Sequence, residues 1–214
     1  MQDKVTIVIA TRNKGKRSEI SDLLKGFPVE IKGLDDFGTI PHIEEDGDTF
    51  DENAYKKASL TARILGFPAL ADDSGLLVEA LEGAPGVLSA RYAGENATDE
   101  QRCQKLLQEM EGKANRKAAF ECVISIAVPT GPALTYEARC EGLIAEQLSG
   151  SNGFGYDPVF YYSPLNKTFG ELTIVEKSHV SHRGKALREF RGEFDKVMIW
   201  IKQHMPVYER KGAA

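Results

Sequence analysis

Residues 120–142 read FECVISIAVPTGPALTYEARCEG, and this stretch decides the fold. Apolar and polar side chains alternate on both sides of a turn formed by Pro129 to Pro132. An alternation with a period of two residues is typical of a strand that buries one face. The stretch therefore predicts a long antiparallel hairpin with one solvated face, in which Cys122 and Cys140 belong to the core.

The rest of the chain mixes strand and helix patterns. Capping-box pairs, Thr49 with Glu52 and Thr98 with Gln101, predict the starts of two helices. We expect strands over 5–10 and 29–34, and helices from the 11–16 loop to about residue 24, over 49–65, over 98–110 and over 183–203. Together with the hairpin, these elements predict an α/β fold with parallel and antiparallel strands.

Bulk composition excludes several classes of protein. The formal net charge of −5 argues against broad nucleic-acid binding, which a basic surplus would indicate. The three cysteines are widely spaced, as in a reduced protein without a zinc motif. Residues 1–4 lack a signal-peptide pattern, and no apolar run approaches about 18 residues. We therefore expect a cytoplasmic protein with no membrane segment.

Two adjacent acids, Asp72 and Asp73, lie between apolar runs and are followed by Ser74 and Gly75. We interpret the pair as the end of a strand that turns at Ser-Gly. Neighbouring carboxylates repel each other unless a cation or a proton lies between them. The pair is therefore a candidate metal or general-base centre, and an Asx-type turn is the alternative without function.

Four further segments carry chemistry. The 11–16 loop, TRNKGK, precedes a helix and is a candidate anion site or a solvated basic turn. The acidic 44–48 segment suits a hard cation such as Mg²⁺ or is a solvated loop. The 151–158 segment, SNGFGYDP, could approach and stack on a base, or its aromatics could fill the core. The basic 177–185 segment, with Ser181 as a helix N-cap, could donate to a purine carbonyl or to phosphate through His182 and Arg183, or is a surface helix start. Together they describe a nucleoside triphosphate site.

With these motifs in this order, and with GAPGVLSARY at 83–92, the chain resembles the inosine triphosphate pyrophosphatase family from Val5 to about Phe190. The resemblance implies Mg²⁺-dependent hydrolysis of ITP, dITP and XTP to the monophosphate and pyrophosphate, which keeps these nucleotides out of DNA and RNA. It also implies a homodimer, and a mixed, strongly curved central sheet flanked by helices, with a cleft between two lobes. Residues 1–204 would form this single domain, and residues 205–214 a tail.

The resemblance also implies roles for individual residues. Asp73 matches the proposed general base, and Glu44 with Asp73 matches the acids at the metal. The matched substrate-binding residues are Thr11, Arg12, Asn13, Lys14, Gly15, Lys16, Ser74, Phe154, Gly155, Tyr156, Asp157, Lys177, His182 and Arg183. Arg12 departs from the family, which often has glycine at that position, so the geometry of the phosphate loop remains open.

The expected reaction is attack of water on the α-phosphorus, with Asp73 or Asp72 accepting the proton. Lys14 and Lys16 would stabilise the phosphate oxygens. His182 and Arg183 would donate to the 6-oxo group of the base and disfavour adenine. Two alternatives remain at this level: a nucleotide sensor that does not hydrolyse its ligand, and an enzyme that releases orthophosphate from the γ position.

Overall fold

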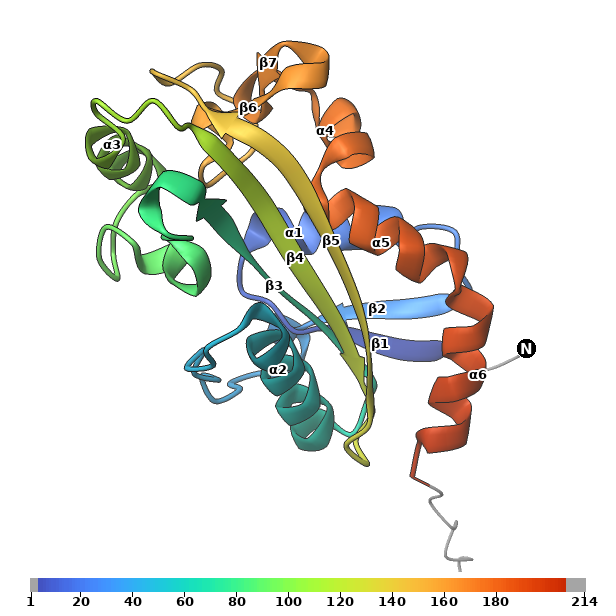
Figure 1. Cartoon of the computed structure of the whole chain (residues 1–214). Coiled ribbons are helices and arrows are strands. Elements are labelled where there is room, and N and C mark those ends of the chain that lie inside the picture. Colours follow the sequence, from blue (N-terminus) through green and yellow to red (C-terminus); the bar gives the residue numbers. More distant parts are fainter. Residues whose placement is uncertain (1–3, 207–214) are drawn as a thin grey trace, which may run out of the picture.

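The computed structural model describes residues 4–206. One open seven-stranded sheet, with strand order β2-β1-β3-β4-β5-β6-β7, runs through the molecule, and its long strands bend along their length (Figure 1). The strands are β1 Val5–Ile9, β2 Val29–Gly33, β3 Ala69–Val78, β4 Lys117–Ala127, β5 Ala133–Ile144, β6 Phe160–Tyr162 and β7 Lys167–Thr168. The helices are α1 Lys14–Leu23, α2 Phe50–Leu65, α3 Asp99–Glu109, α4 Ile174–Val180, α5 His182–Gly192 and α6 Phe194–His204.

The sheet is mixed, as the sequence predicts. Strand β1 runs parallel to β2 and β3, and every later neighbour pair is antiparallel. The β1–β3 ladder stops at Ile9↔Leu70, whereas β3 pairs with β4 over its whole length. Beyond Leu70, β3 has a strand on one side only; on its other edge Leu77 bridges Pro85 and the Leu76 amide donates to Ser89 Oγ at 2.9 Å.

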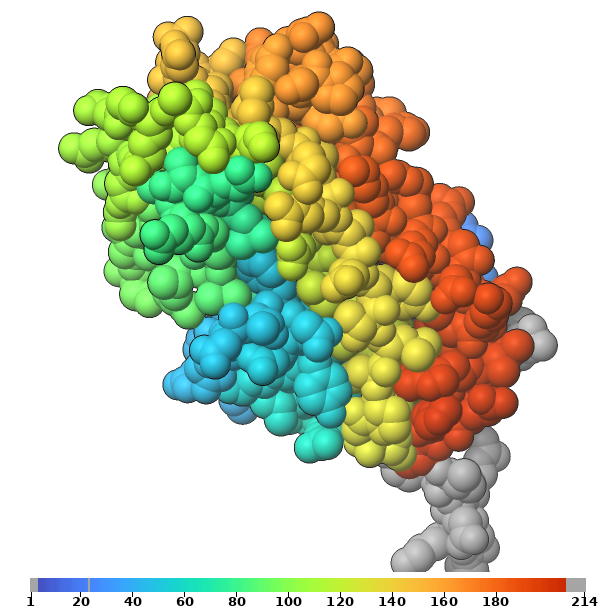
Figure 2. Space-filling model, viewed as in Figure 1, coloured from blue at the N-terminus to red at the C-terminus, as the bar shows by residue number. Residues whose placement is uncertain are grey.

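The predicted hairpin is confirmed as β4 and β5, paired from Lys117↔Leu143 to Ala127↔Ala133. Its solvated face is confined to β5, where buried and exposed residues alternate. Figure 2 shows β5 in yellow as a surface band between α2 and the two C-terminal helices. Strand β4 is buried on both faces because α2 packs on the side opposite the main core.

Two apolar layers flank the centre of the sheet. On one face, Ile20 of α1, Phe190 of α5 and Val197 of α6 belong to the same cluster as Ile7 and Ile124 of the strands. On the other face, small residues allow α2 to approach closely; this cluster contains Ala58, Ala62, Ala69, Ala71 and Ala127. Alanine-rich contact permits a short distance between helix and sheet, so side chains of α2 reach β3 directly.

The helix starts predicted from capping boxes are confirmed. Thr49 accepts from the Glu52 amide and Thr98 from the Gln101 amide, and both boxes are complete. Ser181 likewise accepts from the Gly184 amide at 3.0 Å and caps α5.

The prediction of one C-terminal helix over 183–203 is wrong. The segment forms two helices, α5 and α6, separated at Glu193, where φ is −102° and ψ is 8°. Gly192 is a poor helix former, so a break after it costs little. The break leaves Phe190 and Phe194 both buried, with their rings edge to face at 6.2 Å. Met205 and Pro206 follow α6, and the rest of the predicted tail, 207–214, lies outside the described residues.

Within residues 4–206, no helix combines the length and apolar character needed to span a bilayer.

A close crossing at Gly142 provides a test of the packing. A Cβ there would lie 2.5 Å from Cζ of Phe160 and 2.7 Å from the Tyr161 carbonyl oxygen. We expect Gly142→Ala to lower the free energy of unfolding by about 1–3 kcal/mol, because the backbone of β6 must shift. The matched change Gly192→Ala meets no described atom within 4 Å and should leave stability unchanged or raised. Urea denaturation of both variants checks this; equal effects would refute the crossing.

Candidate functional site

The acids that sequence analysis assigned to a strand end lie inside β3. Residues 72–75 all pair with β4, from Asp72↔Ile124 to Gly75↔Glu121, so the predicted turn at Ser-Gly is wrong. Successive side chains of a strand point to opposite faces. Asp72 therefore faces α1 and α5, and Asp73 faces α2. The two carboxylates are separated by the pleat of the sheet and serve different sets of partners.

Asp72 is held by cations from both ends of the chain. Its Oδ2 lies 3.1 Å from Lys16 Nζ and accepts from Nε and Nη2 of Arg183 at 3.0 and 2.9 Å. Burial alone would raise the pKa of this carboxyl, but Lys16 and Arg183 outweigh it and hold the pKa far below its usual range. Asp72 is therefore ionised at any physiological pH. Because it does not line the cavity, its role is to order its neighbours.

Asp73 lies in a different electrostatic environment. Its Oδ1 accepts from Lys57 Nζ at 3.2 Å, and Glu45 lies 3.1 Å from the same ammonium. Burial raises the pKa of Asp73, and the Glu45 and Asp72 carboxylates reinforce this against Lys57 and Lys16. For Glu45, burial acts to raise the pKa, but Lys57 outweighs it and the pKa is lowered. The two adjacent aspartates therefore differ: Asp72 stays ionised, whereas Asp73 accepts a proton more readily.

The second acid beside Asp73 is Glu45 and not Glu44. Among the described residues, Glu45 lines the cavity, whereas the Glu44 side chain is exposed and lies outside its lining. Arg91 donates to the Glu45 carbonyl at 3.1 Å and Arg12 to the Ile40 carbonyl at 2.9 Å. The chain is thus held at Ile40 and at Glu45. The irregular backbone between these two residues determines that Glu45, and not Glu44, faces Asp73.

The 11–16 loop leads into α1, and the backbone N–H groups at the start of this helix are available as donors to an anion. Asn13 caps α1 by accepting from the Lys16 amide at 3.0 Å. Thr11, Arg12, Asn13 and Lys16 line the cavity, whereas Lys14 is exposed outside the lining. Gly15 also lies outside the lining and touches Phe154, since a Cβ would stand 2.7 Å from the ring. Arg12 is not among the described non-glycine residues with positive φ, so the backbone needs no glycine there, and its guanidinium binds the Ile40 carbonyl.

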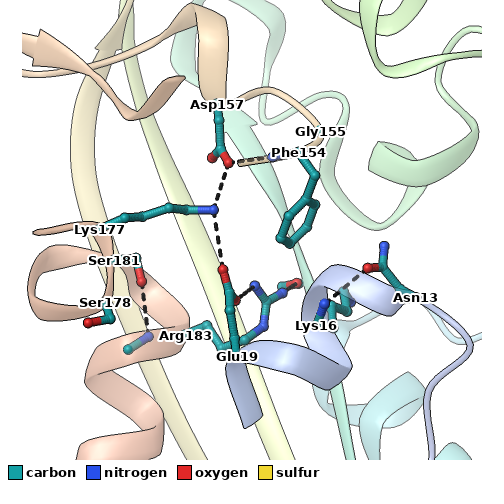
Figure 3. A network of polar contacts seen from close by, with 12 residues as sticks. Asn13, Lys16, Glu19, Phe154, Gly155, Asp157, Lys177, Ser178, Ser181 and Arg183 are labelled. Atoms are coloured by element: carbon teal, nitrogen blue, oxygen red, sulfur yellow. Dashed lines mark hydrogen bonds and ion pairs between the residues drawn. The ribbon is translucent and has the colours of Figure 1, made fainter. Parts of the chain in front are cut away.

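The 153–157 segment faces this loop across the cavity (Figure 3). Asp157 accepts from the Phe154 amide at 2.8 Å and from Lys177 Nζ at 2.6 Å. The Phe154 ring lies 4.5 Å from Lys177 Nζ, measured to the ring centroid. Tyr156 lines the cavity but is mainly a core residue, since its hydroxyl donates to the Ser89 carbonyl at 2.9 Å.

Glu19 joins these groups into one network (Figure 3). One carboxylate oxygen lies 3.4 Å from Lys177 Nζ, and the other accepts from Arg183 Nη1 at 2.7 Å. Arg183 also donates to the Ser74 hydroxyl at 2.7 Å. Most N–H groups of Arg183 are therefore already bonded within the protein, which leaves it little capacity to donate to a base.

His182 lies beside this network in an apolar setting. Its ring stacks on Phe120 with centroids 4.6 Å apart. Burial lowers its pKa well below the ordinary value, and Arg183 and Lys177 add to the effect. The ring is therefore neutral, and its buried Nδ1 has no hydrogen-bond partner within residues 4–206.

A single cavity of about 280 Å³ brings most of the predicted site together. The residues predicted from sequence that line it are Thr11, Arg12, Asn13, Lys16, Asp73, Ser74, Phe154, Gly155, Tyr156, Asp157, Lys177, His182 and Arg183. Sequence reasoning missed Glu45, Lys57 and Glu19. Lys57 left a signal, because it is a charged residue on the face of α2 that carries Ala54, Ala58 and Ala62.

The separate roles of the two aspartates are testable by stability. We expect Asp72→Asn to lower the free energy of unfolding by about 3 kcal/mol, because Arg183 loses its buried counter-charge. Asp73→Asn should change it by less than about 1 kcal/mol or raise it, since the raised pKa marks a carboxylate that its surroundings disfavour. Chemical denaturation at pH 7.5 measures both; similar losses in the two variants would contradict the division.

His182 should make stability depend on pH. Its folded pKa is depressed, so the unfolded chain takes up a proton near pH 6.5 while the folded chain does not. Stability is then lost as pH falls below 6.5, by about 2 kcal/mol between pH 7.5 and pH 5. His182→Gln should remove this part of the loss. Parallel denaturation curves at the two pH values check it, and an unchanged difference would show that folding does not lower the pKa of His182.

Comparison with known proteins finds a family model and relatives that match most of this chain. The model of the Ham1 family matches residues 7–193. A dITP/XTP pyrophosphatase of Syntrophobacter fumaroxidans is 61% identical over 195 residues, which cover 91% of this chain and 84% of that protein. One from Desulfotalea psychrophila is 58% identical over 199 residues, covering 93% and 89%.

Solved structures agree. A HAM1 protein from Coxiella burnetii has a TM-score of 0.84 and 43% identity, over 90% of this chain and 99% of that one. The Ham1 protein of Staphylococcus aureus has a TM-score of 0.82 and 40% identity, over 90% and 99%. The family resemblance and the α/β fold inferred from the sequence are thereby confirmed, and the chain belongs to the Ham1 family.

Proposed function

We propose that this chain hydrolyses nucleoside triphosphates with non-standard purine bases, namely ITP, dITP and XTP, to the monophosphate and pyrophosphate. Such an activity would keep these nucleotides out of DNA and RNA. The relatives named dITP/XTP pyrophosphatase support the substrate class. The observation that carries the proposal is geometric: Asp73 and Glu45 converge in a cavity between the start of α1 and an aromatic, basic loop.

The carboxylates of Glu45 and Asp73 fit a hard divalent cation, for which we propose Mg²⁺. Both carboxylates approach the same Lys57 ammonium, so their oxygens already converge on a positive charge. Within residues 4–206, no group of three or more acidic, histidine or cysteine side chains could hold a metal. Two acids suffice, because Mg²⁺ commonly takes one or two carboxylates and completes its shell with substrate phosphates and water. When bound, it would neutralise charge that develops on the phosphate oxygens.

Asp73 is the proposed general base. A carboxylate with a raised pKa is a better proton acceptor than an ordinary one, and it must be within reach of the attacking water. Lys57 donates to Asp73 and thereby orients it. Burial lowers the pKa of the Lys57 ammonium, but Asp73 and Glu45 outweigh burial and raise it, so Lys57 remains charged. Asp72 is excluded from the base role by its lowered pKa and its ion pairs.

The triphosphate is proposed to lie along the start of α1. The helix N-terminus, the Lys16 ammonium and the Arg12 guanidinium supply positive charge on this side of the cavity. Lys16 is already paired with Asp72 at 3.1 Å, which fixes its position before substrate arrives. A preorganised charge needs little rearrangement as the reaction proceeds. Lys14, exposed outside the lining, would act only at long range.

The base is proposed to lie against Phe154, near Lys177 and His182. Lys177 carries ammonium protons, and neutral His182 offers one ring N–H, so either group could donate to a 6-oxo oxygen. Adenine has an amino group at that position and would leave such a donor unpaired, at a cost of about 1–3 kcal/mol per contact. Arg183 contributes mainly by orienting Ser74 and Glu19, since its own N–H groups are occupied.

A product-resolved assay with ITP and Mg²⁺ tests the activity. We expect IMP with pyrophosphate, and lower rates with GTP and ATP. IDP with orthophosphate would indicate cleavage at the γ position, and binding without turnover would indicate a sensor. Either outcome would refute the proposed reaction.

Asp73→Asn should lower kcat for ITP by about 10²–10⁴-fold, because the amide cannot accept the proton. The variant should still fold, since its stability is expected to be close to that of the wild type. Glu44→Gln is the matched control, an exposed acid outside the cavity, and should keep wild-type rates. Wild-type turnover in Asp73→Asn would remove Asp73 from the mechanism.

Three wider features are part of the same proposal: a single domain of two lobes over residues 1–204 with a tail at 205–214, a homodimer, and a cytoplasmic location. Their support is the family resemblance. Light scattering of the purified chain would decide the oligomeric state.

A further inference from the structure

The cavity-facing 153–157 segment is fixed by a helix that carries none of the predicted site residues. The Gly155 amide donates to Oδ2 of Asp99, the first residue of α3, at 2.7 Å. The thiol of Cys103, one turn further along α3, lies 3.3 Å from the Gly155 carbonyl oxygen. Both polar groups of Gly155 therefore find partners on α3.

Asp99 is itself held firmly. Thr98 caps α3, which fixes Asp99 as the first helical residue. Its other carboxylate oxygen pairs with Arg102. Arg102 also donates to the carbonyls of Ala90 and Ala97, at 2.9 and 2.7 Å. Arg102 would thus stay in place without Asp99, so a substitution at Asp99 removes mainly the contact with Gly155.

The contact matters because of the residues on either side of Gly155. Phe154 turns its ring toward Lys177, and its amide donates to Asp157. Gly155 has φ of +63°, a conformation in which the peptide direction depends on what holds its N–H. A charged acceptor makes a stronger hydrogen bond than a neutral one. The carboxylate of Asp99 therefore sets the direction of the peptide that follows Phe154.

We propose that Asp99 is a positioning residue for selection of the purine base, acting through the Gly155 amide on Phe154 and Asp157. Asp99 also lines the cavity, and in this role it acts through the loop and not by contact with the substrate. The proposal rests on the proposed function, because it assigns Phe154 to the base. It adds a determinant on α3, beyond the segments predicted from sequence, and predicts that recognition depends on the first turn of that helix.

The test uses Asp99→Ala and Asp99→Asn in the full chain. Loss of a charge-assisted hydrogen bond at a half-exposed position should raise KM for ITP about tenfold, with kcat within about twofold, because the loop loosens without altering the reacting groups. The ratio of kcat/KM for ITP over ATP should fall at least threefold, because only ITP has the 6-oxo oxygen that the donors beside Phe154 are proposed to bind. Asp99→Asn keeps an acceptor oxygen but not the charge, so it should raise KM only about threefold. Calorimetric titration with IMP should give matching changes in Kd.

Glu100→Gln is the matched control. It also removes one negative charge from the first turn of α3, but Glu100 contacts Gln104 and not the loop. It should keep the wild-type KM and base preference. A KM for Asp99→Ala within twofold of wild type, or an equal shift in Glu100→Gln, would overturn the proposal. If Asp99→Ala does not fold, an unchanged Asp99→Asn would overturn it as well. Conversion of ITP to IMP by Glu100→Gln tests the proposed function separately.

Discussion

The buried negative charge of Asp72 is the constraint on which the rest of the site depends. A carboxylate removed from water at the centre of a sheet is tolerated only with close counter-charges and hydrogen bonds. Lys16 and Arg183 supply them, and they come from α1 and α5. Satisfying one charge therefore fixes the start of α1 and the start of α5, which both carry residues of the cavity. Arg183 extends the order to Glu19, and through it to Lys177 and Asp157.

Local patterns were sufficient for much of the fold. Alternation in residues 120–142 and the capping threonines predict β4, β5 and the starts of α2 and α3, because each signal lies within a few neighbouring residues. The failures came from tertiary contacts. Asp72 to Gly75 has the composition of a turn, yet pairing with β4 and the bond to Arg183 keep it extended. The break at Glu193 is set by the core that Phe190 and Phe194 must both enter.

The site was predictable as a set of segments and not as a set of contacts. Most residues of the sequence motifs line one cavity. Which of Glu44 and Glu45 faces Asp73 depends on an irregular backbone held by Arg12 and Arg91. These contacts are distant in sequence, so the residues next to the two glutamates do not predict the outcome. Likewise, the opposite directions of Asp72 and Asp73 follow from strand pleating, which a predicted turn conceals.

The ion network also spans nearly the whole chain. The Glu19–Arg183 bond joins residues 164 positions apart, and the Asp72–Arg183 bond joins residues 111 positions apart. During synthesis from the N-terminus, β1, α1 and β3 leave the ribosome long before Arg183 is made. Until then Asp72 has Lys16 as its only close counter-charge from this network, so the face of β3 that carries it must stay hydrated and loosely packed. Completion of the molecule is thus tied to the arrival of one late arginine, and chains truncated before it would carry an acid that the core cannot enclose.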